Sequence, residues 1–248
     1  NNAHCHVDGI AFYGKVFKWY RKAAEQGYVQ AQYNLGYCYY FGEGVAKSVS
    51  LAADWFKKAA EQGHAGAQNA LGDCYRTGEG VTKSSAVAVG WYQKAAEQGH
   101  AEAQYALGDC YRTGDGVTKN GTVAVGWYRR AAEQEHADAQ NMLGICYHNG
   151  DGVAQDNQEA VKWCGKAAEN GLALAQYNMG FFCEHGVGGA NEVDALKWYR
   201  KAAEQGNEDA KKAVKRLENT ISGSGMGSAA AAAAALAGVG LVWTFLKK

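Results

Sequence analysis

A tryptophan recurs along this chain at a nearly constant spacing of 36 residues. The series consists of Trp19, Trp55, Trp91, Trp127, Trp163 and Trp198, and its last interval is one residue shorter than the others. A Leu-Gly or Met-Gly pair recurs beside it and begins at Leu35, Leu71, Leu107, Leu143 and Met179. A fixed period of roughly 20–50 residues is typical of one supersecondary unit stacked many times. Such arrays carry extended surfaces, so the period favours a binding scaffold over an enzyme.

Each period predicts two helices. In residues 48–83, Ser48 is a good N-cap for a helix whose apolar residues recur every three or four positions as far as Ala60. Gly63 can adopt the left-handed conformation that ends such a helix. A second apolar helical face follows over residues 67–75, and two glycines end it. Glu135 stands where the other repeats have the turn glycine. If that turn keeps its left-handed residue, we expect the glutamate to cost about 1 kcal/mol.

The pattern is most complete from residue 88 to residue 116, which reads AVGWYQKAAEQGHAEAQYALGDCYRTGDG. This stretch closely resembles the Sel1-like repeat, a relative of the tetratricopeptide repeat, and the resemblance extends over about residues 8–218. It implies an all-α fold, a right-handed α-solenoid of stacked antiparallel helix pairs. It also implies adaptor or scaffold duty, often within membrane-associated complexes.

The C-terminal part has a different composition. We expect the solenoid over residues 1–221, a Gly/Ser linker over 222–228 and an Ala-rich apolar helix over 229–246. The last segment has 18 residues without a charge, the lower limit for a helix that crosses a bilayer. Its expected anchor residues are Leu236, Gly238, Gly240, Leu241, Trp243, Phe245 and Leu246. The alternative is a soluble helix that docks on protein.

Because residue 1 is Asn, we expect the N-terminus to be processed or incomplete.

The charge balance argues against nucleic-acid binding, and the spacing of the cysteines argues against disulfides between repeats. The chain has 25 basic and 25 acidic residues, so it lacks the electrostatic footprint of an RNA-binding repeat protein. Four cysteines recur with the repeat, at Cys38, Cys74, Cys110 and Cys146. Equivalent residues of stacked repeats lie about 10 Å apart, whereas a disulfide needs Cα atoms within about 7 Å. These four are therefore expected in the core, and only Cys5, Cys164 and Cys183 are candidates for pairing.

No residue pattern points to catalysis. His64, His100 and His136 are one repeat apart, too distant to share a metal, and are interpreted as surface residues at helix starts. His4, Cys5 and His6 form the one dense ligand cluster, but a second ligand pair is missing. We therefore predict no enzyme, no cofactor and no metal site. A redox or metal chaperone built on the cysteines is a further alternative.

Two charged rows follow the tryptophans. The basic row is Lys22, Lys58, Lys94, Arg130, Lys166 and Lys201, and the acidic row, three residues later, is Glu25, Glu61, Glu97, Glu133, Glu169 and Glu204. We interpret them as i,i+3 pairs on a solvated face, worth about 0.2–0.5 kcal/mol each. The alternative is a polar ladder that grips a partner's backbone.

Positions that vary between repeats are where recognition is expected. On the first helix of each pair, the residue before the tryptophan and the second residue after it vary in charge and size. These positions, with exposed positions at helix starts, give the predicted contact residues Arg21, Asp54, Lys57, Gln93, Arg129, Lys162, Lys197, Arg200, Tyr28, Leu172 and Leu174. The predicted function is a scaffold, an accessory subunit that binds and stabilises a membrane-associated protein complex. The alternative is a soluble protein–protein adaptor whose C-terminal helix docks into its partner.

Overall fold

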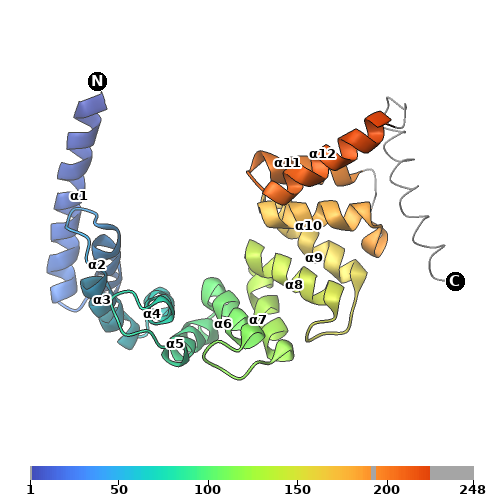
Figure 1. Ribbon diagram of the computed structural model, residues 1–248. Coiled ribbons are helices and arrows are strands. Elements are labelled where there is room, and N and C mark those ends of the chain that lie inside the picture. The colour runs from blue at the N-terminus through green and yellow to red at the C-terminus, as the bar shows by residue number, and fades with distance from the viewer. Residues whose placement is uncertain (1, 191–193, 224–248) are drawn as a thin grey trace. The chain divides into compact units, whose positions relative to one another are not determined.

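The fold is described from a computed structural model, which places the backbone of residues 2–190 and 194–223 and the side chains of residues 14–190 and 194–221. Within these ranges there are twelve α-helices, one short 3₁₀ helix and no β-strand (Figure 1). Each α-helix inside a compact unit packs against the next one along the chain. The all-α prediction of stacked helix pairs is confirmed.

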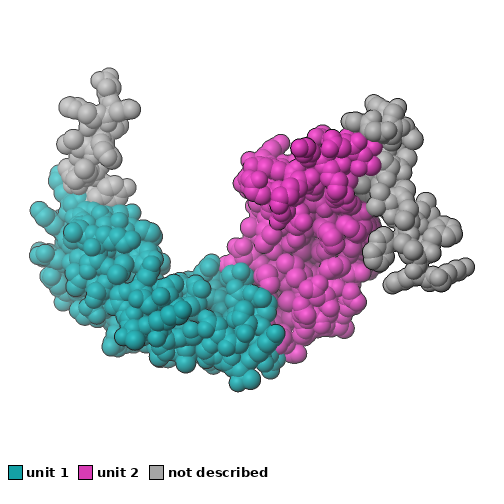
Figure 2. Space-filling model, in the orientation of Figure 1, with its two compact units in different colours: residues 1–120 teal, residues 121–248 magenta. Residues whose placement is uncertain are grey.

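The chain divides into two compact units, residues 1–120 (unit 1) and residues 121–248 (unit 2), coloured teal and magenta in Figure 2. Unit 1 consists of α1 (Asn2–Glu25), α2 (Val29–Phe41), α3 (Val49–Glu61), α4 (Ala65–Thr77), α5 (Ser85–Glu97) and α6 (Ala101–Thr113). Unit 2 consists of α7 (Gly121–Glu133), α8 (Ala137–Asn149), α9 (Asn157–Glu169), α10 (Ala173–Glu184), η1 (Val187–Gly189), α11 (Ala195–Glu204) and α12 (Glu208–Gly223). The division therefore falls inside the predicted solenoid, where the sequence period runs on unchanged.

Helix α12 includes the first two residues of the predicted linker, and the rest of that linker lies outside the described residues. The predicted apolar helix 229–246, with its anchor residues from Leu236 to Leu246, also lies outside them. In the part of the chain that the structure describes, no helix is both long enough and apolar enough to cross a membrane.

The predicted helix caps explain where the helices begin. The Ser48 hydroxyl accepts from the Leu51 N–H at 3.4 Å, and Ser84 caps α5 in the same way. The histidines that were expected only as surface residues are caps as well. His64 Nδ1 accepts from the Ala67 N–H at 3.1 Å, which satisfies a backbone donor that the helix leaves open.

The turn between α7 and α8 keeps its left-handed residue, with Glu135 in the place of glycine. This residue has a φ of +65° and is the one non-glycine residue with positive φ in the described backbone. The other turns of this kind use glycine, as at Gly63 with a φ of +89°. A side chain in this conformation is strained, so the α7–α8 turn keeps the geometry of its neighbours at a cost.

The tryptophans are not the most deeply buried aromatic side chains of the repeats. The fully buried ring belongs to the residue after the tryptophan, as in Phe56, Tyr92 and Tyr199, which are at most 2% exposed. The tryptophans are mostly half-buried, and Trp19 is 70% exposed. Trp55 and Trp91 each pack against the core of the preceding repeat, whereas Trp163 is buried, with 8% of its surface exposed.

From Lys58 onwards, the cations of the basic row lie over the tryptophan rings, so another contact replaces the predicted i,i+3 ion pairs. Lys58 Nζ lies 3.8 Å from the centre of the Trp55 ring. The same contact recurs at 4.3–4.5 Å for Lys94, Arg130, Lys166 and Lys201 over the tryptophan three residues earlier. Glu61 instead pairs with Lys57, at 4.0 Å. A cation over an indole ring contributes about 0.5–1 kcal/mol at an exposed site.

The glycine of each Leu-Gly pair makes room for the buried ring. A Cβ added at Gly72 would lie 2.6 Å from Tyr92 Cε1, and one at Gly36 would lie 2.5 Å from the ring of Phe56. Real side chains essentially never come so close. The glycine therefore lets the second helix of one pair approach the first helix of the next.

A row of buried glutamines, which the sequence analysis missed, joins the repeats. Gln68 Nε2 donates to the Ala60 carbonyl at 3.1 Å, and Gln98 Nε2 donates to Gln68 Oε1 at 2.7 Å. The same arrangement links Gln62 to Gln32 and Gln205 to Gln176. Because buried polar groups need partners, these amides fix the register of adjacent helix pairs.

All six cysteines in the described part are buried and free. This confirms the core role of the four periodic cysteines, and it shows that Cys164 and Cys183 are not paired. Burial raises the pKa of the Cys164 thiol to about 12 and that of the Cys74 thiol, helped by Asp73, to about 11. The side chains of His4, Cys5 and His6 lie outside the described ones.

Candidate protein-binding surface

All of the predicted contact residues except Leu172 are exposed, but most of them bind a neighbour on their own unit. Arg21 pairs with Glu25 at 3.4 Å, Lys162 pairs with Glu159 at 2.6 Å, and Gln93 donates to Glu97 at 2.9 Å. These pairs lie along single helices, so they form surface rows and no enclosed site.

Lys57 pairs with Glu61 along α3 in the same way. The remaining predicted residues fall into two groups. Arg129 donates to the Tyr147 hydroxyl at 2.7 Å, and Arg200 pairs with Glu218 at 2.6 Å, so both reach the second helix of their pair. Asp54, Lys197, Tyr28 and Leu174 are exposed, whereas Leu172 is half-buried and packs against the core of unit 2.

A cleft in unit 1 is formed mainly by the second helices of the pairs. This α2–α4 cleft encloses about 420 Å³, room for one or two side chains of a partner. It is lined by Tyr37, Tyr40 and Phe41 of α2, by Phe56 of α3, by Ala70, Asp73, Cys74, Arg76 and Thr77 of α4, by Glu79 of the following loop, and by Glu102 of α6. A second, smaller cleft, the α4–α6 cleft, shares Asp73, Arg76 and Glu102 with it.

One wall of the α2–α4 cleft is aromatic. The rings of Tyr37 and Phe41 stack with centroids 5.7 Å apart and planes 8° apart, and Tyr40 meets Phe41 edge-on at 5.0 Å. Phe41 is 60% exposed although it is a large apolar side chain in the last turn of α2. An aromatic cluster with an open ring face is a typical anchor site of protein interfaces.

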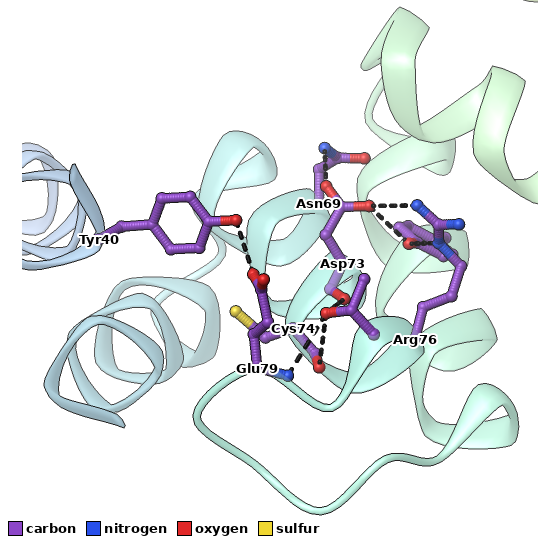
Figure 3. A network of polar contacts seen from close by, with 8 residues as sticks. Tyr40, Asn69, Asp73, Cys74, Arg76 and Glu79 are labelled. Carbon is purple, nitrogen blue, oxygen red and sulfur yellow. Dashed lines mark hydrogen bonds and ion pairs between the residues drawn. The ribbon is translucent and has the colours of Figure 1, made fainter. Parts of the chain in front are cut away.

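The opposite wall is a network of polar side chains, shown in Figure 3. Asp73 accepts from the Tyr92 hydroxyl at 2.7 Å and from Asn69 Nδ2 at 3.4 Å, and it pairs with Arg76 at 3.4 Å. Arg76 Nε donates to the Tyr92 hydroxyl at 3.0 Å. The network ties the cleft to the buried ring of Tyr92, so its walls are held rigidly.

Glu79 bridges the two walls. Its Oε2 accepts from the Tyr40 hydroxyl at 2.6 Å, which joins the loop after α4 to α2. This hydrogen bond, with burial, raises the pKa of Tyr40 to about 12. Burial, followed by Asp73, also raises the pKa of Tyr92 above its usual range. Both phenols therefore stay neutral donors at physiological pH.

Cys74 is the thiol that lines the α2–α4 cleft. Burial, the acidic surroundings and the raised pKa of its thiol keep Cys74 protonated, so it is a poor nucleophile. In the described part of the chain, His, Cys, Asp and Glu side chains form no group that could hold a metal ion.

Sequence reasoning missed these residues because it compared only the first helices. The position after the Leu-Gly or Met-Gly pair varies as strongly on the second helices and reads Tyr37, Asp73, Asp109, Ile145 and Phe181. The position three residues further on reads Tyr40, Arg76, Arg112, His148 and Glu184. Comparing repeats over both helices would have indicated these two columns.

Repeated helix pairs, joined by glycine turns and by a buried glutamine row, define an α-helical repeat protein. The Sel1 repeat matches residues 17–28, 29–64, 65–100, 101–136, 137–172 and 173–207. The chain therefore belongs to the Sel1 repeat family.

Two solved structures show the likeness. One is a protective antigen present in uropathogenic Escherichia coli strains, which displays an SLR fold. It is 39% identical to this chain with a TM-score of 0.77, and the match covers 84% of this chain and 44% of the antigen. A Sel1 repeat protein from Oxalobacter formigenes is 40% identical with a TM-score of 0.72 over 76% of each chain. This chain thus spans less than half the length of the Escherichia coli antigen. No curated protein matches the chain.

Proposed function

We propose that this chain is a non-enzymatic scaffold that binds a partner protein at the α2–α4 cleft of unit 1. Sel1 repeat proteins are generally scaffolds for protein–protein interaction. The observation that carries the assignment is the exposed Phe41 ring, stacked on Tyr37 beside a rigid polar wall. An open apolar ring rimmed by fixed polar groups is what a protein interface requires.

The test is quantitative co-purification from the native cells. The full chain is compared with Phe41→Ala, which removes the aromatic anchor, and with Lys57→Ala, which changes an exposed residue of the first-helix rows. Partners should be lost about tenfold or more with Phe41→Ala and retained with Lys57→Ala, because buried aromatic anchors dominate binding energy. Retention with Phe41→Ala and loss with Lys57→Ala would move the site to the predicted first-helix rows.

The finer proposal is that the partner belongs to a membrane-associated complex, to which residues 229–246 attach the scaffold. It is supported by the uncharged stretch of 18 residues in that segment. Membranes from native cells should retain the full chain during carbonate extraction and release a chain truncated after Ser222. Equal release of both forms would favour the soluble adaptor whose C-terminal helix docks into its partner.

A further inference from the structure

We infer that the occupant of the α2–α4 cleft is a cationic segment of the partner, an arginine or lysine next to an apolar side chain. This inference rests on the proposed function and specifies the chemistry of what the cleft binds. It follows from the charge of the lining residues, from the open aromatic face and from a hydrogen-bond acceptor that lacks a donor.

The cleft is acidic although the whole chain is neutral. Asp73, Glu79 and Glu102 line it against a single cation, Arg76, which gives a formal charge of −2. Arg76 is already bound to Asp73 and to the Tyr92 hydroxyl. In the adjoining α4–α6 cleft, Asp115 adds another carboxylate, and Asp109 is paired with Arg112 at 2.9 Å.

Glu79 is the carboxylate best placed to receive a cation. Its side chain accepts from a neutral phenol, that of Tyr40, and within the described residues no basic group lies at ion-pair distance from it. A carboxylate offers about four acceptor sites, so this one hydrogen bond leaves most of them available. A guest guanidinium or ammonium group would bind Glu79 without displacing Tyr40.

The aromatic wall is suited to the same guest. Lys47 Nζ lies 5.6 Å from the centre of the Tyr40 ring, so a ring of this wall already receives a cation of the chain itself. Phe41 offers a similar ring with 60% of its surface open. Arginine and lysine stack their charged heads and apolar stems on such rings, and an apolar neighbour would cover the remainder.

Asn69 supplies an independent observation. It is 8% exposed, and its Oδ1 is a buried acceptor without a partner. In unit 2 the equivalent Asn141 Oδ1 accepts from Asn178 Nδ2 at 2.8 Å. The residue at the Asn178 position in unit 1 is Ala106, which lines the α4–α6 cleft. Unit 1 therefore lacks this donor next to the α4–α6 cleft, which adjoins the α2–α4 cleft and shares Asp73, Arg76 and Glu102 with it. Arginine carries five donors and no acceptor, so it could supply the donor.

The experiment selects peptides without assuming a partner. Random 12-residue peptides displayed on phage are selected on the immobilised full chain, and the enriched peptide is synthesised and titrated by fluorescence anisotropy. We expect enrichment of arginine or lysine beside an apolar residue. Glu79→Gln, which keeps the acceptor for Tyr40, should weaken binding about tenfold, and raised salt should weaken it further. Asp54→Asn, an exposed acid on α3 outside the cleft, should change it by less than about twofold.

Thermal melts verify that each variant is folded. The remaining outcomes distinguish a failure of the cationic occupant from a failure of the α2–α4 cleft as the binding site. Enrichment of acidic or uncharged apolar peptides, lost with Phe41→Ala but unaffected by Glu79→Gln, overturns the cationic occupant and leaves the proposed site in place. Peptides that bind equally well to Phe41→Ala and Glu79→Gln, or a selection without enrichment, overturn both the occupant and the α2–α4 cleft as the site.

Discussion

The substitution Gly72→Ala tests how the repeats pack together. A Cβ at this position would meet Tyr92 Cε1 at 2.6 Å and Cδ1 at 2.7 Å. Tyr92 is fully buried and its hydroxyl is held by Asp73 and Arg76, so the ring cannot turn aside without breaking that network.

The expected change in the free energy of unfolding of Gly72→Ala is the difference between two opposing effects. Overpacking of a core costs about 1–3 kcal/mol, and the fixed ring of Tyr92 places this site at the upper end. Alanine is favoured over glycine inside a helix by about 1 kcal/mol, which offsets part of the cost. We therefore expect Gly72→Ala to lower the free energy of unfolding by about 2 kcal/mol, or Tm by about 4–8 °C.

The matched control is Gly90→Ala. Gly90 also lies inside a helix, α5, but a Cβ there would meet no atom within 4 Å. This variant should be stabilised by about 0.5–1 kcal/mol through helix propensity alone. Both variants are measured by urea unfolding followed by circular dichroism at one protein concentration. If Gly72→Ala is as stable as Gly90→Ala, the account of the Leu-Gly glycines is wrong.

Three further substitutions have signs fixed by the structure. Ala106→Asn should supply the donor that Asn69 Oδ1 lacks and raise the free energy of unfolding by about 1 kcal/mol in urea titrations. Glu135→Gly should raise it by about 1 kcal/mol, because glycine adopts the φ of +65° without strain. His64→Asn should remove part of the acid sensitivity of the fold. Burial lowers the pKa of His64, and its neutral Nδ1 caps α4. The contribution of this cap to the free energy of unfolding is therefore fully present above the unfolded pKa of about 6.5, and it is lost as the pH falls through the pKa of the folded state.

Each of these expectations has an outcome that contradicts it. A destabilised Ala106→Asn variant would show that the two units do not use equivalent hydrogen bonds at this position. A loss of stability in Glu135→Gly would mean that the glutamate side chain makes a compensating contact. For His64→Asn, the urea midpoints of wild type and variant at pH 5.0 and pH 7.5 are compared, and an equal acid shift in both would exclude the cap as its source.

The helices and their limits could be predicted because they follow from local patterns. Ser48 and Ser84 cap helices where the apolar spacing begins, and glycines end them. Glu135 was recognised as strained because five equivalent turns have glycine. Period and turn chemistry agree in most repeats of the described chain, which is why the fold could be identified from the sequence.

Periodicity could not predict which of two adjacent aromatic rings is buried and which faces solvent. Trp55 and Phe56 are adjacent, and both fall within the broad apolar face of α3. Size favours the tryptophan as the buried residue, yet Phe56 is the one that packs over Gly36. Lys58 covers the outer face of Trp55, a contact that depends on side-chain direction and not on spacing alone.

The cleft was missed for a different physical reason. Its residues lie on α2, α3, α4, the loop after α4 and α6, and they meet only when those segments are packed together. The hydrogen bond from Tyr40 to Glu79 joins residues 39 positions apart, and no local pattern predicts it. The boundary between the two units also has no sequence signal, because the repeat is unbroken across residues 120 and 121.

The most direct test of the central claim is photo-cross-linking in native cells. A photoreactive phenylalanine analogue replaces Phe41 in the α2–α4 cleft or Lys57 on the outer face of α3, one site per chain. The account predicts a discrete partner adduct from position 41 that is lost when Glu79→Gln is added, and none from position 57. An adduct from position 57 alone, or one from position 41 that survives Glu79→Gln unchanged, would contradict it.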